Sequence, residues 1–283
     1  MTVTQELQKR WQDITFKDNF VFGKTLELFP DLCLQVVEMI TNFKIKHISY
    51  PEREKTIDAR IDSKGIRLDV FVEDDHNRSF DLEMQISNAH DLLKRTRYYQ
   101  GLIDLEKLKK GNHYSSLGES FIIFICPFQL FGQDQHKYIW QTKCINNPNI
   151  SDTDGVTKIF LSTKGSDFDI STDLFNFLQY VDNSTVSDNF TNRLNCAVEM
   201  VKSSEKVRLD FMTFQMALLE SKLEGEEIGR EKGRAEGREE ERMQMVQNLL
   251  LANTPIEFIS KATGWSKDKL LKITQSLDQN KNL

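Results

Sequence analysis

Apolar and polar residues alternate with a period of two along two neighbouring segments, residues 66–74 and 79–86. A period of two is the pattern of a half-buried β-strand, and the Asp, His and Asn at 75–77 favour a turn between the segments. We therefore predict a hairpin whose register brings the two apolar faces together. A shift by one residue would put each apolar face on the wrong side, so only even shifts compete with it. The apolar pairs of this register are Val70 with Leu82 and Val72 with Phe80.

The same register places two acidic side chains opposite each other, Asp69 on the first strand and Glu83 on the second. Opposed carboxylates repel, but a divalent cation between them would turn this cost into a binding site, because Mg²⁺ prefers carboxylate oxygens. Gln85 shares the face of Glu83 and lies opposite Arg67, so it can reach a water or a phosphate at such a site. Acidic exposed faces are common on amphipathic hairpins, and a solvated face without metal is the competing interpretation.

The remaining elements follow from helical periodicity, continuous apolar runs and turn-forming residues. The run at 121–126 is almost wholly apolar and stops at Pro127, which predicts a central strand buried on both faces. Gly111 stands where glycine commonly ends a helix. The predicted helices are 5–29, 31–43, Ser87 or Asn88 to about Lys110, 171–200 and 209–220, and the further strands are 55–62, 121–126, 136–145 and 156–163.

The order helix, three strands, helix, strand predicts an α/β core at 1–165, followed by a helical C-terminal half that begins with a support region at 166–219. The next segment, 220–242, carries a glycine at every fourth position among Glu and Arg. Each interior glycine costs a helix about 1 kcal/mol against alanine, so four at one spacing favour the close approach of a second helix, as in a homodimer. A charged, partly frayed linker is the equally open alternative. The four glycines are Gly225, Gly229, Gly233 and Gly237.

The last segment, 243–283, predicts a small helix-turn-helix-like module. Residues 254–257 fit a capping box with Thr254 as the N-cap; Gly264 then breaks the chain, and Ser266 can cap the next helix. Lysines on the second helix could contact DNA. Packing or partner binding fits equally well, because no set of Arg and Asn for reading bases is evident.

The overall composition limits the class of protein. Of the 283 residues 28% are charged and 39% are hydrophobic, and the net charge is −6, which fits a globular protein with a real core and argues against coating DNA by charge alone. No apolar run approaches the ~18–20 residues that span a bilayer, and the polar N-terminus lacks the apolar stretch of a signal peptide. The four cysteines are isolated, which favours reduced thiols in a cytoplasm.

A local excess of basic residues follows the hairpin directly. Between residues 87 and 113 six Lys and Arg stand against three acids, a local charge of +3 beside the predicted site. On a helix Arg95 and Tyr99 share a face whereas Arg97 points elsewhere, so we expect Tyr99 at the site and Tyr98 in the core. A solvated helix face is the alternative to phosphate binding, and the neighbouring acidic hairpin favours phosphate binding.

Four short motifs stand in a fixed order along the chain: Asp13-x-x-Phe16-Lys17, Arg67-x-Asp69-Val70, Glu83-x-Gln85 and Arg95-x-Arg97-Tyr98-Tyr99. In this order they resemble the PD-(D/E)XK nucleases, in which a strand with Asp precedes a strand with Glu-x-Lys or Glu-x-Gln and then a helix. Among these, the chain is similar to the PD-(D/E)XK transposase-like proteins of the Rpn (recombination-promoting nuclease) family, whose tails also carry a glycine at every fourth position. The resemblance covers about residues 10–165 and the tail.

This resemblance implies a restriction-endonuclease-like core and a DNA endonuclease that depends on Mg²⁺ or Mn²⁺ and is linked to recombination, mobile elements or defence. It implies that Asp69 and Glu83 bind the metal and that Gln85 takes the place of the usual catalytic lysine. Glutamine is neither an acid nor a base, so it can only orient a water or bind through its carbonyl oxygen. The residues implied in DNA contact are Lys17, Lys94, Arg95, Arg97 and Tyr99, and Asp58 and Asp62 on the preceding strand are candidates for supporting the site.

Two other interpretations of the chain compete with the nuclease. One is a catalytically weak nuclease fold that binds DNA or a partner protein through its C-terminal helices. The other is a purely structural dimer whose acidic hairpin is solvated. Intact Asp69, Glu83 and Gln85 favour the nuclease, because an inactive protein has no physical need to keep opposed carboxylates.

Overall fold

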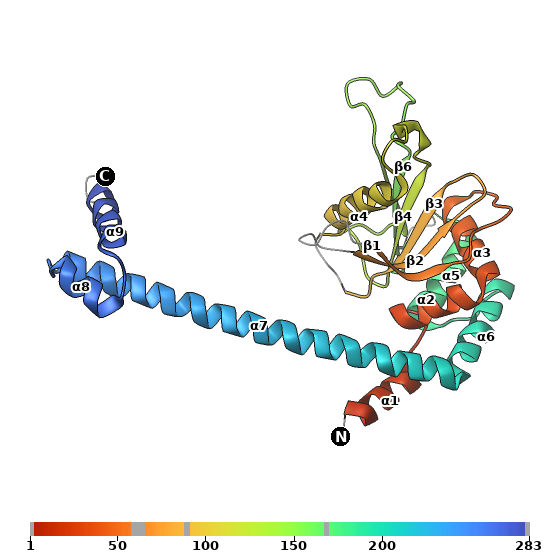
Figure 1. Ribbon diagram of the computed structural model, residues 1–283. Coiled ribbons are helices and arrows are strands. Elements are labelled where there is room, and N and C mark those ends of the chain that lie inside the picture. Colours follow the sequence, from red (N-terminus) through yellow and green to blue (C-terminus); the bar gives the residue numbers. More distant parts are fainter. Residues whose placement is uncertain (1–2, 58–65, 88–90, 167–169, 281–283) are drawn as a thin grey trace. The chain divides into compact units, whose positions relative to one another are not determined.

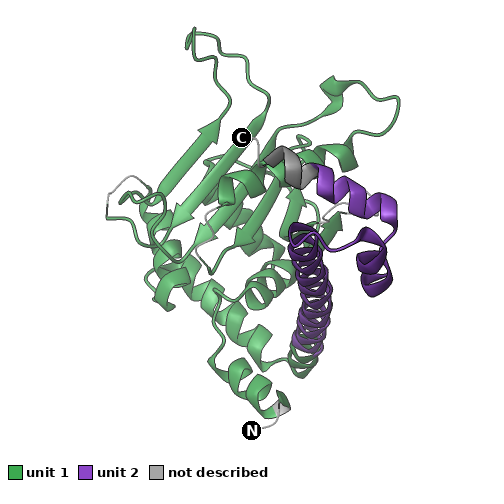
Figure 2. Cartoon of the chain, turned by 90° about the vertical axis from the view of Figure 1, so that its left-hand side faces the viewer, with its two compact units in different colours: residues 1–212 green, residues 213–283 purple. Residues whose placement is uncertain are grey.

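The structure, a computed structural model, describes residues 3–57, 66–87, 91–166 and 170–280. The chain forms two compact units, residues 1–212 and residues 213–283 (Figure 2). The end of the strand predicted at 55–62, with Asp58 and Asp62, lies outside the described residues.

A six-stranded mixed sheet organises the first unit, in the order β1-β2-β3-β4-β6-β5. The first three strands form an antiparallel meander, β3, β4 and β6 run parallel, and β5 lies antiparallel to β6 at the far edge. This is the predicted α/β order of a helix, three strands, a helix and a strand. The strands are β1 Glu52–Ile57, β2 Ile66–Glu73, β3 Ser79–Met84, β4 Ser120–Cys126, β5 Lys137–Gln141 and β6 Val156–Ser162.

Helices cover both faces of this sheet (Figure 1). The helix α4 packs on the face that carries Phe71, Phe124 and Phe160, and α2 packs against the first three strands on the other face, together with α3, α5 and α6. Every residue of β4 is buried, as its apolar run predicts. The helices of this unit are α1 Val3–Asp13, α2 Asn19–Leu28, α3 Pro30–Thr41, α4 Leu92–Lys107, the short η1 Tyr114–Ser116, α5 Thr172–Asn183, α6 Asn189–Ser203 and the start of α7 Glu205–Leu251.

Four of the predicted helices differ from the observed ones, and one of them, predicted at 209–220, is part of the longer α7. The single helix predicted at 5–29 is wrong, because the Asp18 side chain accepts a hydrogen bond from the Phe20 N–H at 3.0 Å and starts a second helix there. The helix predicted from Ser87 or Asn88 begins only at Leu92 and ends at Lys107. The helical region predicted at 171–200 is divided, because Ser184 adopts a left-handed backbone (φ 61°) that ends α5.

The second unit contains most of α7, together with α8 Ile256–Thr263 and α9 Lys267–Asn280. The glycine-containing segment 220–242 is helical along its whole length, inside α7. A small core of Val246, Ile259, Trp265 and Leu270 joins the end of α7 to α8 and α9. In the part of the chain that the structure describes, no helix is both long and apolar enough to cross a membrane.

The ends of α8 and α9 test the predicted caps. The prediction of a capping box at 254–257 is wrong, because Pro255 occupies the N-cap position of α8 and no side-chain hydrogen bond caps that helix. Gly264 ends α8 in the left-handed region (φ 73°), as predicted. The Ser266 hydroxyl accepts a hydrogen bond from the Lys269 N–H at 3.3 Å, which confirms it as the cap of α9.

Candidate active site

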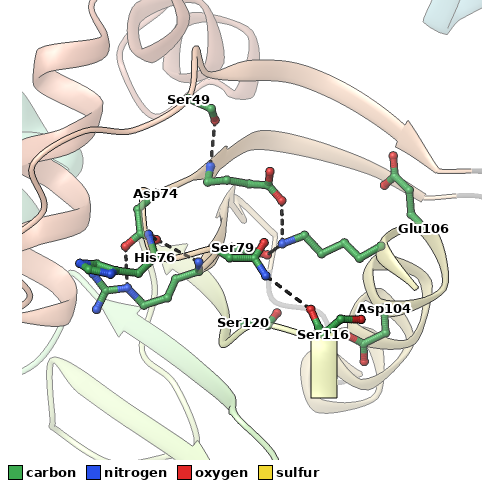
Figure 3. A network of polar contacts seen from close by, with 12 residues as sticks. Ser49, Asp74, His76, Ser79, Asp104, Glu106, Ser116 and Ser120 are labelled. Atoms are coloured by element: carbon green, nitrogen blue, oxygen red, sulfur yellow. Dashed lines mark hydrogen bonds and ion pairs between the residues drawn. The ribbon is translucent and has the colours of Figure 1, made fainter. Parts of the chain in front are cut away.

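The turn of the β2–β3 hairpin is fixed by the side chain of Asp74 (Figure 3). One carboxylate oxygen of Asp74 accepts hydrogen bonds from the N–H groups of His76 and Arg78, each at 2.9 Å, and the other lies 2.5 Å from Arg78 Nε. Asn77 takes a left-handed backbone (φ 60°), which asparagine tolerates well. These contacts hold the loop in one conformation and so help to set the register of the strands.

A lysine from α4 ties down the same end of the hairpin (Figure 3). Lys107 Nζ lies 2.6 Å from a carboxylate oxygen of Glu73 on β2 and donates to the Ser79 hydroxyl on β3, also at 2.6 Å. The Glu73 N–H donates to the Ser49 hydroxyl at 2.9 Å. Lys107 therefore has a structural partner on each strand, and it positions the hairpin rather than facing a ligand.

The observed register confirms the prediction, with Val70 opposite Leu82 and Val72 opposite Phe80. Among the described residues the β2–β3 ladder ends at Val70, so the predicted pair of Arg67 with Gln85 does not form. Asp69 and Glu83 form the next pair in this register. Here side-chain carboxylates, in place of backbone carbonyls, accept the hydrogen bonds between the two strands. A Glu83 carboxylate oxygen accepts the Asp69 N–H at 3.0 Å, and an Asp69 carboxylate oxygen accepts the Met84 N–H at 3.0 Å.

The acidic face of β3 is buried, which contradicts the competing interpretation of a solvated face. All six residues of β3 are buried, and Asp81 and Glu83 retain exposures of only 1% and 4%. The register with β4 places Asp81 beside Ile122 and Glu83 beside Phe124, in the layer that α4 covers. The acids therefore lie in a low-dielectric environment, where their charges are costly.

This burial changes the protonation of the three carboxyls. Burial raises the pKa of Asp69 to about 6, against a partial compensation by the Met84 N–H and by the charges of Arg67 and Arg95. Burial, followed by the charges of the neighbouring acids, raises the pKa of Glu83 and that of Asp81 well above the ordinary range. The protein alone therefore disfavours the charged forms of these three carboxyls.

Gln85, Arg95 and Tyr99 form a hydrogen-bonded chain next to the acids. Arg95 donates to the carbonyl oxygen of the Gln85 amide at 2.5 Å and to the Tyr99 hydroxyl at 2.9 Å, and its guanidinium also lies 3.9 Å from a Glu83 carboxylate oxygen. The Gln85 amide nitrogen donates to the Ser87 carbonyl at 2.6 Å, so both ends of the amide have partners. The predicted shared face of Arg95 and Tyr99 is confirmed.

The other residues predicted to contact DNA lie in different places. Lys94 and Arg97 are exposed on α4, on the same side of the sheet as the acids. Tyr98 is 39% exposed, so its expected place in the core is wrong. Lys17 lies among the helices on the opposite face of the sheet, where its ammonium group donates to the Asp182 backbone carbonyl of α5 at 3.2 Å. The structure therefore does not bring Lys17 to the acids.

The acids fit a divalent cation by their chemistry. Asp69 and Glu83 each give one oxygen to a backbone N–H. The other oxygens, Asp69 Oδ1 and Glu83 Oε2, could bind a cation, although Glu83 Oε2 also lies 3.9 Å from Arg95, and Mg²⁺ is commonly held by one or two protein carboxylates. Both oxygens of Asp81 are buried without a hydrogen-bond partner in the described part of the chain. No group of three or more His, Cys, Asp or Glu poised around a metal occurs among these residues, so the donor set is a pair of carboxylates with polar neighbours.

Asp81 is the site residue that the sequence interpretation missed. It lies two residues before Glu83 on the same face of β3, so its spacing gave a signal. The alternation of apolar and polar residues made it look like an ordinary solvated position. Only the packing of α4 over this face shows that Asp81 belongs to a buried cluster.

Comparison with known proteins gives one match. The family model described as PD-(D/E)XK nuclease family transposase matches residues 10–164, more than half of the chain. The matched segment contains the whole sheet and the cluster formed by Asp69, Glu83, Gln85 and Arg95. No curated protein and no solved structure matches the chain.

Proposed function

The chain belongs to the PD-(D/E)XK nuclease family transposases, and from this premise we propose that it is a Mg²⁺-dependent endonuclease that hydrolyses phosphodiester bonds of DNA. The observation that supports the proposal most is the cross-strand pair Asp69 and Glu83, in which each carboxylate is held by a backbone N–H of the other strand. A buried pair of acids is costly for a protein that has no use for it.

In this proposal Asp69 and Glu83 hold the cation, which is Mg²⁺ or Mn²⁺. When bound there, the cation supplies Lewis-acid polarisation of a phosphoryl oxygen and lowers the pKa of water. The raised pKa values of the two carboxyls favour this role, because a cation would stabilise the charged forms that burial disfavours. The neighbouring Asp81, two residues from Glu83, is a further cause of the raised pKa of Glu83.

Arg95 supplies the positive charge that Gln85 cannot. A lysine at position 85 would carry a charge next to Glu83, and here the guanidinium of Arg95 lies beside Glu83 while it donates to the Gln85 amide. Gln85 holds Arg95 in position, since its amide nitrogen is fixed by Ser87. We propose that Arg95 binds the phosphate whose charge increases during cleavage and that Gln85 is its positioning residue.

The test is cleavage of supercoiled plasmid DNA by the full chain in Mg²⁺ or Mn²⁺. We expect Asp69→Asn and Glu83→Gln, which keep the side-chain shapes, to lower the nicking rate by about a hundredfold or more, because each removes a ligand charge. Asp75→Asn is the matched control, since Asp75 is an exposed acid in the turn of the same hairpin. Equal nicking by the wild type and both site variants would refute the catalytic assignment.

A binding protein without cleavage is the second candidate, and the glutamine at position 85 is the observation that favours it. Glutamine can neither donate nor accept a proton in catalysis. In this case the chain would bind DNA through Lys94, Arg95 and Arg97 and leave the plasmid intact in every metal. Cleavage that disappears in both site variants would exclude this candidate.

We propose a homodimer through residues 220–242 as the assembly. A Cβ atom built on any of the four glycines meets nothing within 4 Å, so the stripe is open to a second helix. Leu223 and Ile228 on the same segment are 56% and 59% exposed. The molar mass in solution tests this: Gly229→Leu with Gly233→Leu should convert a dimer to a monomer, and a wild-type monomer would refute the proposal.

A cytoplasmic location and a link to recombination, mobile elements or defence complete the proposed role.

A further inference from the structure

A hollow of about 470 Å³ opens beside the acidic cluster, between the start of β2 and the first turns of α4. Three cationic side chains line it against a single acid, Asp91, and two tyrosines complete the wall. Its volume is in the range of pockets that hold a whole small molecule, about 300–1,000 Å³, and is more than one phosphate group needs. The cations are Arg67, Lys94 and Arg95, and the tyrosines are Tyr98 and Tyr99.

Arg95 connects this hollow to the candidate active site. Its guanidinium lines the hollow, donates to Gln85 at 2.5 Å and lies 3.9 Å from Glu83. Tyr99 is held in place by a hydrogen bond from Arg95 and by its contact with the Phe124 ring, with ring centroids 6.2 Å apart. A group bound in the hollow therefore lies next to the two carboxylates.

A second hollow of about 350 Å³ follows along α4 and shares Lys94 and Tyr98 with the first. Arg97 contributes the further cation of this second hollow. Tyr98 thus stands between two cation-lined hollows with 39% of its surface exposed. An aromatic ring between cations is the arrangement by which proteins hold single-stranded nucleic acid, with a base on the ring and the flanking phosphates on the cations.

We infer that these hollows bind an unpaired nucleotide of the substrate, with its base stacked on Tyr98 and its phosphates on Arg67, Lys94 and Arg97. In a duplex the faces of each base are covered by its neighbours, so tyrosine can stack only on a base that is unpaired or displaced. The substrate class is therefore DNA with single-stranded or distorted segments rather than a regular duplex. The inference rests on the proposed function, because it places this nucleotide beside the scissile phosphate.

The test measures binding without cleavage, in the full chain carrying Asp69→Asn and in the presence of Mg²⁺. Fluorescence anisotropy compares four labelled probes of one sequence: a blunt DNA duplex, the same duplex with a central unpaired bulge, the single DNA strand and the single RNA strand. We expect the bulged and single-stranded DNA to bind about tenfold more tightly than the duplex, which is the affinity that one stacked base contributes. RNA binding equal to that of single-stranded DNA would extend the inference to both, since stacking needs only a base.

Variants separate stacking from charge. Tyr98→Ala should remove the preference for unpaired DNA, and Tyr98→Phe should keep it, because phenylalanine retains the ring. Lys94→Ala should weaken all probes equally and reduce the salt dependence by about one counterion. Tyr114→Ala is the matched control, since Tyr114 is 83% exposed and lines neither hollow.

The outcomes distinguish this inference from the proposed function. Equal binding of duplex and unpaired DNA, or a preference that survives Tyr98→Ala, would overturn the inference and leave the nuclease proposal in place. A Tyr98-dependent preference in a protein that cleaves no DNA would support the inference and count against the nuclease. Absence of binding to every probe would overturn both.

Discussion

Replacing Asp69 by asparagine should stabilise the metal-free protein at neutral pH although it removes a candidate catalytic group. Burial raises the pKa of Asp69 from 3.8 to about 6, so the folded state disfavours the ionised form. The corresponding cost at pH 7.5 is about 3 kcal/mol, because each pKa unit is worth about 1.4 kcal/mol. Asparagine carries no charge, and its carbonyl oxygen can still accept the Met84 N–H.

The sign of the pH dependence follows from the raised pKa. Below about pH 3 Asp69 is protonated in both the folded and the unfolded state, and at pH 4 it is only about half ionised in the unfolded state, so the variant and the wild type differ little at these pH values. As the pH rises towards 6 and beyond, the unfolded state loses the proton first, and the wild type loses stability relative to the variant. The ionisation of Asp69 is coupled to that of Glu83 and Asp81. We therefore expect Asp69→Asn to raise the free energy of unfolding by an amount on the order of 1–3 kcal/mol at pH 7.5.

The assay is urea unfolding of both proteins at pH 4 and pH 7.5 with EDTA, followed by a repeat at pH 7.5 with Mg²⁺. Mg²⁺ should stabilise the wild type, by about 1.4 kcal/mol at ten times the dissociation constant, and leave Asp69→Asn unchanged. Asp75→Asn controls for the general effect of removing an acid from this hairpin. An Asp69→Asn variant that is no more stable at pH 7.5, or equally more stable at pH 4, would refute the electrostatic reasoning.

Three further predictions concern Arg95, Gly118 and the pH dependence of Mg²⁺ binding. Arg95→Lys should retain part of the cleavage activity that Arg95→Ala loses, since lysine keeps the charge but not the fork that contacts Gln85 and Tyr99; equal loss in both would show that geometry dominates. Gly118→Ala should destabilise the fold by about 1–3 kcal/mol, because the added Cβ would lie 2.0 Å from the Asn77 carbonyl oxygen, and an unchanged melting temperature would contradict this close approach. The affinity for Mg²⁺, measured by its effect on melting temperature, should fall as the pH drops below about 6, because protons then compete for Asp69; a constant affinity from pH 5 to 8 would exclude Asp69 as a ligand.

The hairpin and its register could be predicted from the sequence because a period-two pattern allows only even shifts, and the apolar pair Val70 and Leu82 selects one of them. The central strand β4 was equally predictable from its apolar run. In contrast, the sequence pattern predicted one helix through Asp18, where the structure begins a second helix. Helical periodicity does not show which Asp side chain will accept a hydrogen bond from a backbone N–H and so start a new helix. Local signals therefore predicted the hairpin and β4 well, whereas they missed the helix ends and the bounds of β1 and β5, which were predicted at 55–62 and 136–145.

The site was only partly predictable for a related reason. Asp69 and Glu83 follow from the register, but their burial depends on the tertiary packing of the following helix, α4, over this face of the sheet. The contact of Arg95 with Gln85 and the unpartnered state of Asp81 are likewise tertiary properties. No local pattern distinguishes a solvated acid on a strand from one that a later helix covers.

The carboxylates of Asp69 and Glu83 are held by backbone N–H groups where the strand ladder ends. Because these bonds fix one oxygen of each carboxylate, the ligands are already oriented, and binding would not have to order a loop or close a cleft. The choice between cations then depends on size and charge rather than on refolding, and exchange of Mg²⁺ for Mn²⁺ should leave the hairpin as it is. The end of the β2–β3 ladder would thus be a preorganised cation-binding site. Backbone pairing stops there, and this loss of pairing, which elsewhere would only weaken the sheet, places the two carboxylates.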